Sequence, residues 1–410
     1  MGLDMRWVGE EAYDRVAEAR LYSSAPGMRD LPSMRDRLRL HPEMKPGDVL
    51  LAEGNGRVLG TATQIGFQMW VRGGAVPCQG VAWVGAIKTE RRKGASRRAP
   101  GVATAVMWEV LKKARETEQV VSALMPFRAS FYEHFGYGVV ERRNEWTFPL
   151  SVLPAGDFDG FRFVTDADWP AVAACKQRMV EAGQCEIERS PDQWTFWRTV
   201  RTNGFTIIDR PNDTGPVHST VYFEEFTKDG KTYVKVLDWA ADSIPAARRI
   251  LYWLASLRDQ YTAAEMVFPA DWPINRWLRE TQLPHRPVEH AVASYRPMTR
   301  IQVRILDHRR FLEAIHWTQH AKGKAVVAVR ESEGIVAKFE LDVSRGRAGV
   351  KPTNATAEIE CSDRLWAAVA CGDLPASVAL RMGLLEGTSG AAALLDNLSY
   401  GPAPFCQEYF

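Results

Sequence analysis

The feature that most constrains the fold lies between residues 81 and 116, where a strand-like run, a basic loop and an amphipathic helix follow one another. Residues 81–87 are apolar apart from one glycine, which is typical of a buried strand. Residues 88–100 are rich in Arg and Lys and contain Gly and Pro, so they are expected to form a loop. From residue 102 onward, apolar side chains recur at helical spacing, with basic side chains largely on the opposite face. This succession predicts a mixed α/β domain.

The residues before this segment predict a β-hairpin. Two short apolar runs at 49–52 and 58–62 have the length of strands. The turn between them contains Asn55 and Gly56, a pair that favours the primed turns of two-residue hairpins.

The residues after the helix continue the same mixed pattern. An apolar run at 120–125 predicts a strand, and a short helix that carries Tyr132 is expected to follow it. A last strand is expected toward residues 145–148. We therefore assign residues 1–154 to one N-terminal domain.

The pattern of the N-terminus returns near residue 160. A short strand there leads into a helix start capped by an aspartate, which is similar in shape to residues 5–11. We interpret this as a weak internal repeat. It predicts a second α/β domain over residues 155–297, with a Pro-Ala-Gly turn at 154–156 marking the boundary.

A third unit is predicted for residues 298–410. Its expected elements are helices and strands at 309–317, 324–330, 335–341, 356–360 and 363–371. Low-complexity linkers are absent between the three parts, so they are expected to pack as one body.

Charge and cysteine usage exclude several classes of protein. The 52 basic and 50 acidic residues give a net charge of +2, so neither nucleic acid nor an anionic membrane is an expected partner. The six cysteines form no C-x-x-C pair and no zinc-finger spacing, so reduced, buried thiols and no metal site are expected. The N-terminus has no apolar signal segment, and no apolar run could span a bilayer, so a soluble, cytoplasmic protein is expected.

The basic loop ends in a short pattern that suits a pyrophosphate. The pattern is R-x-x-G-x-A, and its residues are Arg98, Ala99, Gly101, Val102 and Ala103. Backbone N–H groups at the start of a helix attract anions, a glycine allows close approach, and arginine adds charge-assisted contacts. An ordinary strand–helix turn remains an alternative, and so does phosphate binding by residues 91–94, which begin with Arg91.

This order of elements resembles the GNAT acetyltransferase superfamily, and the whole chain resembles the enhanced intracellular survival (Eis) family within it. Residues 131–138, Phe-Tyr-Glu-His-Phe-Gly-Tyr-Gly, are similar to that family's aromatic signature. The tail at 401–410 ends in Phe410 and resembles that family's C-terminus. The resemblance implies an α/β fold of two tandem GNAT-like domains followed by a sterol-carrier-like domain.

The resemblance also implies the chemistry of an N-acetyltransferase that uses acetyl-CoA. Backbone groups of Val84 and Ala86 would contact the pantetheine arm, and the loop around Gly101 would hold the pyrophosphate. Tyr132 would be the general acid, and the terminal carboxylate of Phe410 would act as the base. The implied acceptors are aminoglycoside-like amines, polyamines or lysine side chains, and the implied assembly is a hexamer.

The sequence also permits an alternative function. The loop before Gly101 is longer than is usual in the family, so a lipid- or CoA-binding regulatory protein with a decayed transferase site is the alternative. The second domain has no glycine in residues 242–248, so it is not expected to bind CoA. Tyr137 is expected to be a core residue, and His134 a solvated or structural one.

Overall fold

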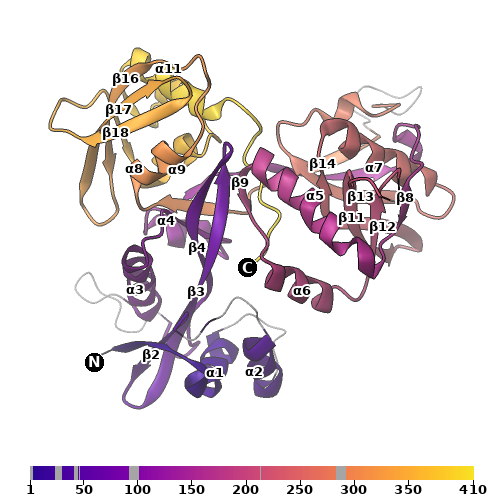
Figure 1. Ribbon diagram of the computed structural model, residues 1–410. Helices are drawn as coiled ribbons and strands as arrows, with labels where there is room; N and C mark the ends of the chain where they lie inside the picture. Colours follow the sequence, from indigo (N-terminus) through magenta and orange to yellow (C-terminus); the bar gives the residue numbers. More distant parts are fainter. Residues whose placement is uncertain are drawn as a thin grey trace.

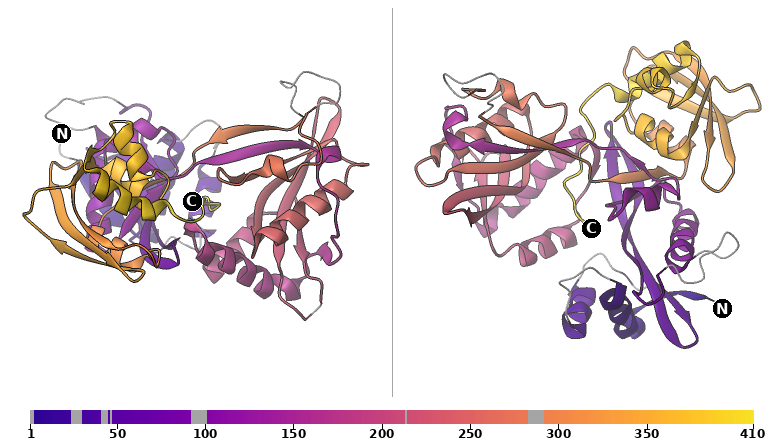
Figure 2. Two further views of the ribbon diagram at one scale, coloured as in Figure 1. Left: turned by 90° about the horizontal axis from the view of Figure 1, so that it is seen from above. Right: turned by 180° about the vertical axis from the view of Figure 1, so that it is seen from behind.

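The chain is organised by three β-sheets in the computed structural model (Figure 1). The structure describes residues 3–23, 30–40, 45, 47–91, 101–212, 214–282 and 292–410. Within these residues the sheets have eight, seven and five strands. The third sheet and its helices lie against the end of the first unit, and the second unit lies beside them (Figures 1 and 2). The C-terminal tail, yellow in Figure 1, passes between the first and second units.

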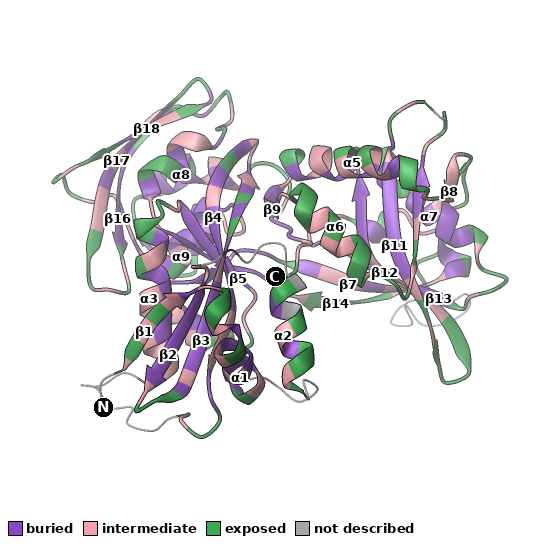
Figure 3. Ribbon diagram, turned by 60° about the horizontal axis from the view of Figure 1, so that its bottom comes forward, coloured by how far each residue is buried: buried purple, intermediate pink, exposed green. Residues whose placement is uncertain are grey.

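The first sheet is mixed, as the sequence predicts. Its order is β1-β2-β3-β4-β5-β15-β6, with β9 also on the edge of β3, and only β4 and β5 pair in parallel. The strands are β1 (Asp4–Val8), β2 (Val49–Gly54), β3 (Arg57–Val71), β4 (Gly74–Ala86), β5 (Val121–Leu124), β6 (Gly138–Val139), β9 (Gln184–Ile187) and β15 (Gln302–Ile305). Most of β3, β4 and β5 is buried (Figure 3).

The predicted hairpin between β2 and β3 is confirmed. Asn55 and Gly56 have φ angles of 52° and 71°, which are the positive values that a primed turn requires. The turn lets the two strands keep their right-handed twist and fixes their register.

Helices cover both faces of the first sheet. They are η1 (Glu10–Ala12), α1 (Tyr13–Ser23), α2 (Leu31–Leu40), α3 (Val102–Glu116) and α4 (Ala129–Glu133). The predicted amphipathic helix is α3, whose buried side includes Val106, Val110 and Leu111. The opposite face of the sheet receives α1 and α2, because Val49 and Leu51 share their buried cluster.

Two strands cross the predicted domain boundaries. The strand expected at 145–148 forms as β7 (Arg143–Pro149), but it pairs with β13 (Ala263–Pro269) and β14 (Ser294–Met298) of the second sheet. In return β15, from the start of the third unit, lies between β5 and β6 of the first sheet. The sheets therefore change over at positions other than 154 and 297, and the domain boundaries at these residues stay predictions.

The second unit repeats the opening of the first. Its sheet has the order β14-β7-β13-β12-β11-β10-β8. The further elements are β8 (Phe161–Phe163), η3 (Asp166–Asp168), α5 (Trp169–Ala182), α6 (Pro191–Val200), β10 (Phe205–Asp209), β11 (Ser219–Lys228), β12 (Lys231–Ala241) and α7 (Ile244–Ser256), with η2 (Leu150–Val152) and η4 (Ile274–Arg276) in its connections. A strand, a short 3₁₀ turn and a helix open both units, as the weak sequence repeat predicts.

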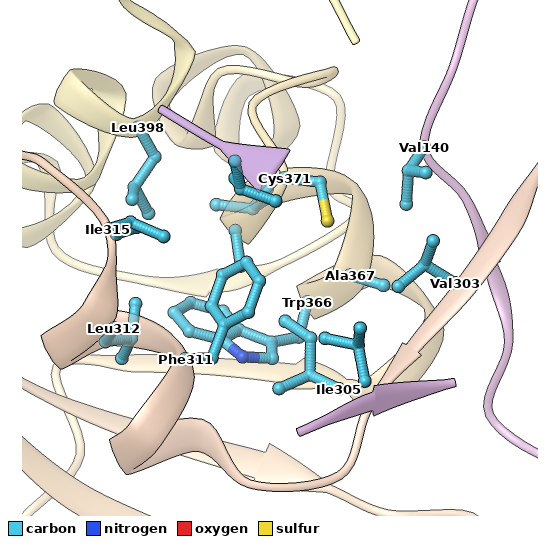
Figure 4. Close-up of a cluster of buried hydrophobic side chains, with 14 of the residues drawn as sticks. Val140, Val303, Ile305, Phe311, Leu312, Ile315, Trp366, Ala367, Cys371 and Leu398 are labelled. Carbon is cyan, nitrogen blue, oxygen red and sulfur yellow. The ribbon is translucent and has the colours of Figure 1, made fainter. Parts of the chain in front are cut away.

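The third unit packs a five-stranded sheet against short helices. Its elements are α8 (His308–Ala314), β16 (Gly323–Arg330), β17 (Val336–Ser344), β18 (Arg347–Pro352), β19 (Ile359–Ser362), α9 (Asp363–Ala370), α10 (Ala376–Arg381), β20 (Glu386–Gly387), α11 (Ser389–Leu395) and η5 (Asp396–Ser399). Trp366 and Phe311 lie at its centre, and the same buried cluster includes Ile305 of the first sheet and Val140, the residue after β6 (Figure 4). This shared core joins the third unit to the first.

The cysteines are free and buried, as the sequence predicts. All six thiols are unpaired and lie in the interior. Burial raises the pKa of both Cys175 and Cys361 to about 12, so these thiols keep their protons at neutral pH. Within the described part of the chain, no helix has the length and apolar character needed to cross a membrane.

Candidate active site

The parallel strands β4 and β5 separate at one end. Their pairing runs from Cys78 opposite Val121 to Val81 opposite Leu124, and β4 then continues as far as Ala86 paired with β3 but not with β5. Just beyond Val81 the β3–β4 register shifts, and Trp83 has a φ of 55°, in the left-handed region. Such bulges redirect a strand and are frequent beside active sites. The edge of β4 after Val81 is therefore open toward β5 among the residues that the structure describes.

The first turn of α3 lies over this open part of β4. A Cβ atom added to Gly60 of β3 would be 2.7 Å from the Gly85 carbonyl oxygen and 2.8 Å from Val102 Cγ1. Gly60, the splayed part of β4 and the start of α3 are thus packed closely. The N-cap residue of α3 is Gly101, which has no side chain with which to cap this end of the helix. Its first backbone N–H groups can therefore bind an anion.

The predicted cofactor-binding residues gather here as far as they are described. Val84 and Ala86 lie on the open strand, and Val102 and Ala103 form the first turn of α3. Gly101 has φ −66° and ψ 160°, which any residue can adopt, so its glycine provides room rather than a special backbone conformation. Arg98 and Ala99 fall outside the described residues.

The rival residue Arg91 lies on the other side of the same strand end. Its Nη2 atom donates a hydrogen bond to the Ser23 carbonyl oxygen at 2.8 Å, at the end of α1. A Cβ atom on Gly85 would be 2.6 Å from the Ser23 side chain. Arg91 is therefore close to the splayed end of β4, so it stays a second candidate for contacts with phosphate.

Tyr132 lies where β4 and β5 part. It shares a buried cluster with Val81 and Leu124, the last paired residues of the two strands. Its ring contacts those of Phe131 and Tyr137 at centroid distances of 5.0 and 6.2 Å. No hydrogen bond to its hydroxyl is present within the described residues. Burial raises the pKa of Tyr132 well above its usual value, so the phenol is protonated at neutral pH.

The two neighbouring candidates behave as the sequence predicts. Tyr137 is fully buried, and its hydroxyl lies 2.7 Å from Ser122 Oγ, which itself donates to Gln79 Oε1 at 2.9 Å. It is a core residue with satisfied hydrogen bonds. His134 is exposed and contacts the edge of Trp108.

Phe410 reaches the same end of the β4–β5 ladder from the opposite face. Its ring lies 4.9 Å from that of Phe67, and its Cδ2 atom would be 3.1 Å from a Cβ atom on Gly80. Gly80 and Val81 are consecutive in β4, and successive residues of a strand face opposite sides of a sheet. Tyr132 and Phe410 therefore flank the point where the two strands separate.

The tail that brings Phe410 to this position is held along its length. Phe405 N donates to the Gln184 carbonyl oxygen, and Cys406 N donates to Glu141 Oε1. Gln407 N donates to Glu186 Oε2 at 2.8 Å, and Glu408 forms a 2.7 Å ion pair with Arg189. The C-terminus is thus an ordered part of the fold rather than a frayed end.

A cleft of about 530 Å³ opens beside β3, between this strand and the start of α6. Phe67, the neighbour of Phe410, is one of its walls. Three carboxylates and one ammonium group line it, and these are Asp48, Glu188, Asp192 and Lys45. The cleft therefore favours a cationic ligand close to the terminal residue.

Sequence reasoning missed both this cleft and the charges that hold the tail. Glu186 and Asp238 are buried carboxylates with apolar residues on either side in the sequence, which is a signal of buried ion pairs that the sequence does contain. Their partners, Lys176 and Arg189, come from other elements, so spacing along the chain could not reveal them. Among the described residues, no group of three or more His, Cys, Asp or Glu side chains has the arrangement of a metal site.

Comparison with known proteins agrees with this geometry. Residues 5–140 match the acetyltransferase (GNAT) domain family. An N-acetyltransferase of Streptomyces avermitilis, itself uncharacterized, is 26% identical over 405 residues, with 89% of each chain covered.

Solved structures share the fold over the whole chain. A GCN5-related N-acetyltransferase from Anabaena variabilis superposes with a TM-score of 0.84 at 16% identity and full coverage of both chains. Eis1 from Mycobacterium abscessus gives 0.79 at 19% identity, again with both chains fully covered. A similar enzyme from Kribbella flavida gives 0.76 at 21% identity, with 100% of this chain and 98% of that one covered.

Proposed function

We propose that this chain, an N-acetyltransferase with a GNAT domain over residues 5–140 and an Eis-like fold, transfers acetyl from acetyl-CoA to a cationic amine. The observation that carries this proposal is the position of Tyr132 and Phe410 on opposite faces of the point where β4 and β5 separate. A thioester bound in that opening would have a protonated phenol on one side and the end of the chain on the other.

The open strand and the start of α3 support the site of the cosubstrate. The unpaired edge of β4 at Val84 and Ala86 offers backbone groups to the amides of the pantetheine arm. The first turn of α3, at Val102 and Ala103, follows a glycine N-cap and suits the pyrophosphate. Arg91 or Arg98 would add charge.

In the proposed reaction, Tyr132 acts on the leaving thiolate and the Phe410 carboxylate acts on the attacking amine. The amine nitrogen attacks the thioester carbonyl carbon, so a C–N bond forms and the C–S bond breaks. Tyr132 gives its proton to the departing thiolate, and the Phe410 carboxylate takes a proton from the amine, directly or through water. The ordinary pKa of a phenol, about 10, is close to that of a thiol, about 8.5, and burial raises the pKa of Tyr132, so the phenol still carries its proton when the thiolate forms.

The acidic cleft supports the class of acceptor. Asp48, Glu188 and Asp192 would attract an amine with several positive charges, such as an aminoglycoside, a polyamine or a lysine-rich segment. The Glu188 carboxylate is fixed by hydrogen bonds from Trp70 Nε1 and Gln177 Nε2, at 2.9 and 3.3 Å. The homo-hexamer implied by resemblance stays a prediction, which native mass spectrometry can test.

Substitution of Gly101 tests where CoA binds. Gly101→Trp is expected to raise the Kd for CoA at least about 100-fold, because each lost charge-assisted hydrogen bond costs about 1.5–3 kcal/mol. Calorimetric titration with CoA measures this directly. The backbone angles of Gly101 are open to any residue, so the fold should persist.

Gly349→Trp is the matched control. This exposed glycine of the third unit has open space around its Cα, so the same indole is added far from the site. Wild-type affinity in Gly101→Trp would refute the assignment. Loss of affinity in Arg91→Ala alone would move the phosphate site to residues 91–94.

A further inference from the structure

The second unit has an opening like the one that we assign to CoA in the first. Its parallel strands β12 and β13 pair only from Tyr233 opposite Ala263 to Lys235 opposite Glu265. Strand β12 continues to Ala241, and its register with β11 shifts immediately afterwards, so that Leu237 is an extra residue. In β12, as in β4, the pairing with the parallel strand ends and a bulge follows within the next two residues.

Protein groups fill this second opening. The Trp239 indole Nε1 donates to the Val267 carbonyl oxygen at 3.0 Å, which bridges from β12 to β13. Phe268 and Trp272 contact the same indole at ring distances of 5.6 Å each. The helix that follows also has its own cap, because Ser243 Oγ accepts from Ala246 N. These contacts support the expectation that the second unit binds no CoA.

The C-terminal tail occupies the part of β12 that remains open. The side-chain amide of Gln407 accepts from Trp239 N at 3.2 Å and donates to the Trp239 carbonyl oxygen at 2.8 Å. One side chain thus satisfies both backbone groups of one strand residue, as a neighbouring strand would. The ring of Phe405 lies against the same tryptophan, at 6.1 Å.

Buried charges fix the residues on either side of this contact. Arg189 pairs with Asp238 at 2.9 and 3.1 Å and with Glu408 at 2.7 Å. Lys176 pairs with Glu186, whose second oxygen accepts from Gln407 N. Burial would lower the pKa of Arg189, but Asp238 and Glu408 raise it on balance, so Arg189 keeps its positive charge. Movement of any one of these side chains would leave the charge of its partner buried and unpaired, which costs free energy. The cluster therefore holds the tail in one position.

We propose that the second unit serves as a dock that positions the C-terminal residue in the first unit's active site, with Gln407 and Glu408 as positioning residues. The bulged strand that holds a cosubstrate in one repeat holds the tail in the other. Gln407 and Glu408 act through Phe410 and do not touch the reacting groups. This inference rests on the proposed role of the Phe410 carboxylate, but the docking itself can be measured without any reaction.

Release of Phe410 by a carboxypeptidase that prefers aromatic residues tests the dock. In the intact protein, Phe410 should be removed slowly, as intact-mass spectrometry over time would show. Gln407→Leu removes both hydrogen bonds to Trp239 while keeping a side chain of similar size, and it should speed release about tenfold or more. Glu408→Ala, which breaks the ion pair with Arg189, should act in the same direction.

Gln282→Leu is the matched control, because it makes the same change at an exposed site of the second unit. Release from Gln407→Leu and Glu408→Ala at the wild-type rate would overturn the proposal. So would faster release that merely follows a fall in Tm, which the control and a thermal melt would reveal.

Activity measured on the same variants separates the dock from the proposed function. The kcat for amine acetylation should fall with the loosened tail, while the Kd for CoA stays at the wild-type value. Faster release of Phe410 with an unchanged kcat would support the dock but refute the role of Phe410 as the base. A lowered kcat with a tail that is released no faster would refute the dock.

Discussion

Tyr132→Phe is expected to lower kcat by about 10²–10⁴, because it removes the proton that the departing thiolate needs while keeping the ring that packs at the end of β5. The Kd for CoA should stay close to the wild-type value. Stopped-time thiol detection with acetyl-CoA and an amine measures kcat, and calorimetry measures CoA binding. Because burial raises the pKa of Tyr132, its acid form persists at neutral pH, and a loss of activity through its ionisation is expected only at strongly alkaline pH.

Tyr137→Phe is the matched control for this prediction. This substitution also removes a phenolic hydroxyl, and the ring centroid of Tyr137 lies 6.2 Å from that of Tyr132. The Tyr137 hydroxyl, however, forms a hydrogen bond with Ser122 in the core. The substitution should lower stability by about 1 kcal/mol and leave kcat largely unchanged. Turnover at the wild-type rate in Tyr132→Phe would exclude Tyr132 as the acid.

Deletion of Phe410, or extension of the chain beyond it by a short tag, is expected to remove most of the transferase activity while CoA still binds. Deletion moves the terminal carboxylate by one residue, and it removes the ring that packs on Phe67. Extension converts the carboxylate to an uncharged amide at the same position. Either change leaves β4, α3 and Tyr132 intact, so the Kd for CoA measures their integrity.

A tag at the N-terminus and the substitution Phe410→Leu serve as controls for these two variants. Phe410→Leu keeps the carboxylate and an apolar side chain, so it should retain far more activity than the deletion. A fully active protein with a C-terminal tag would contradict the role of the terminal carboxylate.

Local patterns were enough to predict the strand and the helix on which the candidate site is placed. The run from β4 through the loop to α3 carries its own signals, namely an apolar strand, a glycine and helical periodicity. The turn at Asn55 and Gly56 is likewise set by the conformational preferences of its own residues. The resemblance then supplied roles for Tyr132 and Phe410, which these signals alone could not assign.

Long-range pairings were not predictable in the same way. β7 has the alternating pattern of a strand, but nothing in its residues states which sheet completes it. The dock for the tail joins Trp239 to Gln407, which are 168 positions apart, and further charges come from α5 and from residues 186–189. Such contacts depend on topology, so only the folded chain reveals them.

The most direct test of the central claim is amine-dependent release of CoA thiol by the purified chain. Acetyl-CoA would be offered with an aminoglycoside, a polyamine and a lysine-containing peptide, and the products would be weighed by mass spectrometry. The account predicts that at least one of these cationic amines gains an acetyl group for each thiol released, and that Tyr132→Phe abolishes most of that release. If the chain binds CoA but none of the amines raises thiol release above the rate without amine, the account is contradicted, and a CoA-binding regulatory protein is the better description.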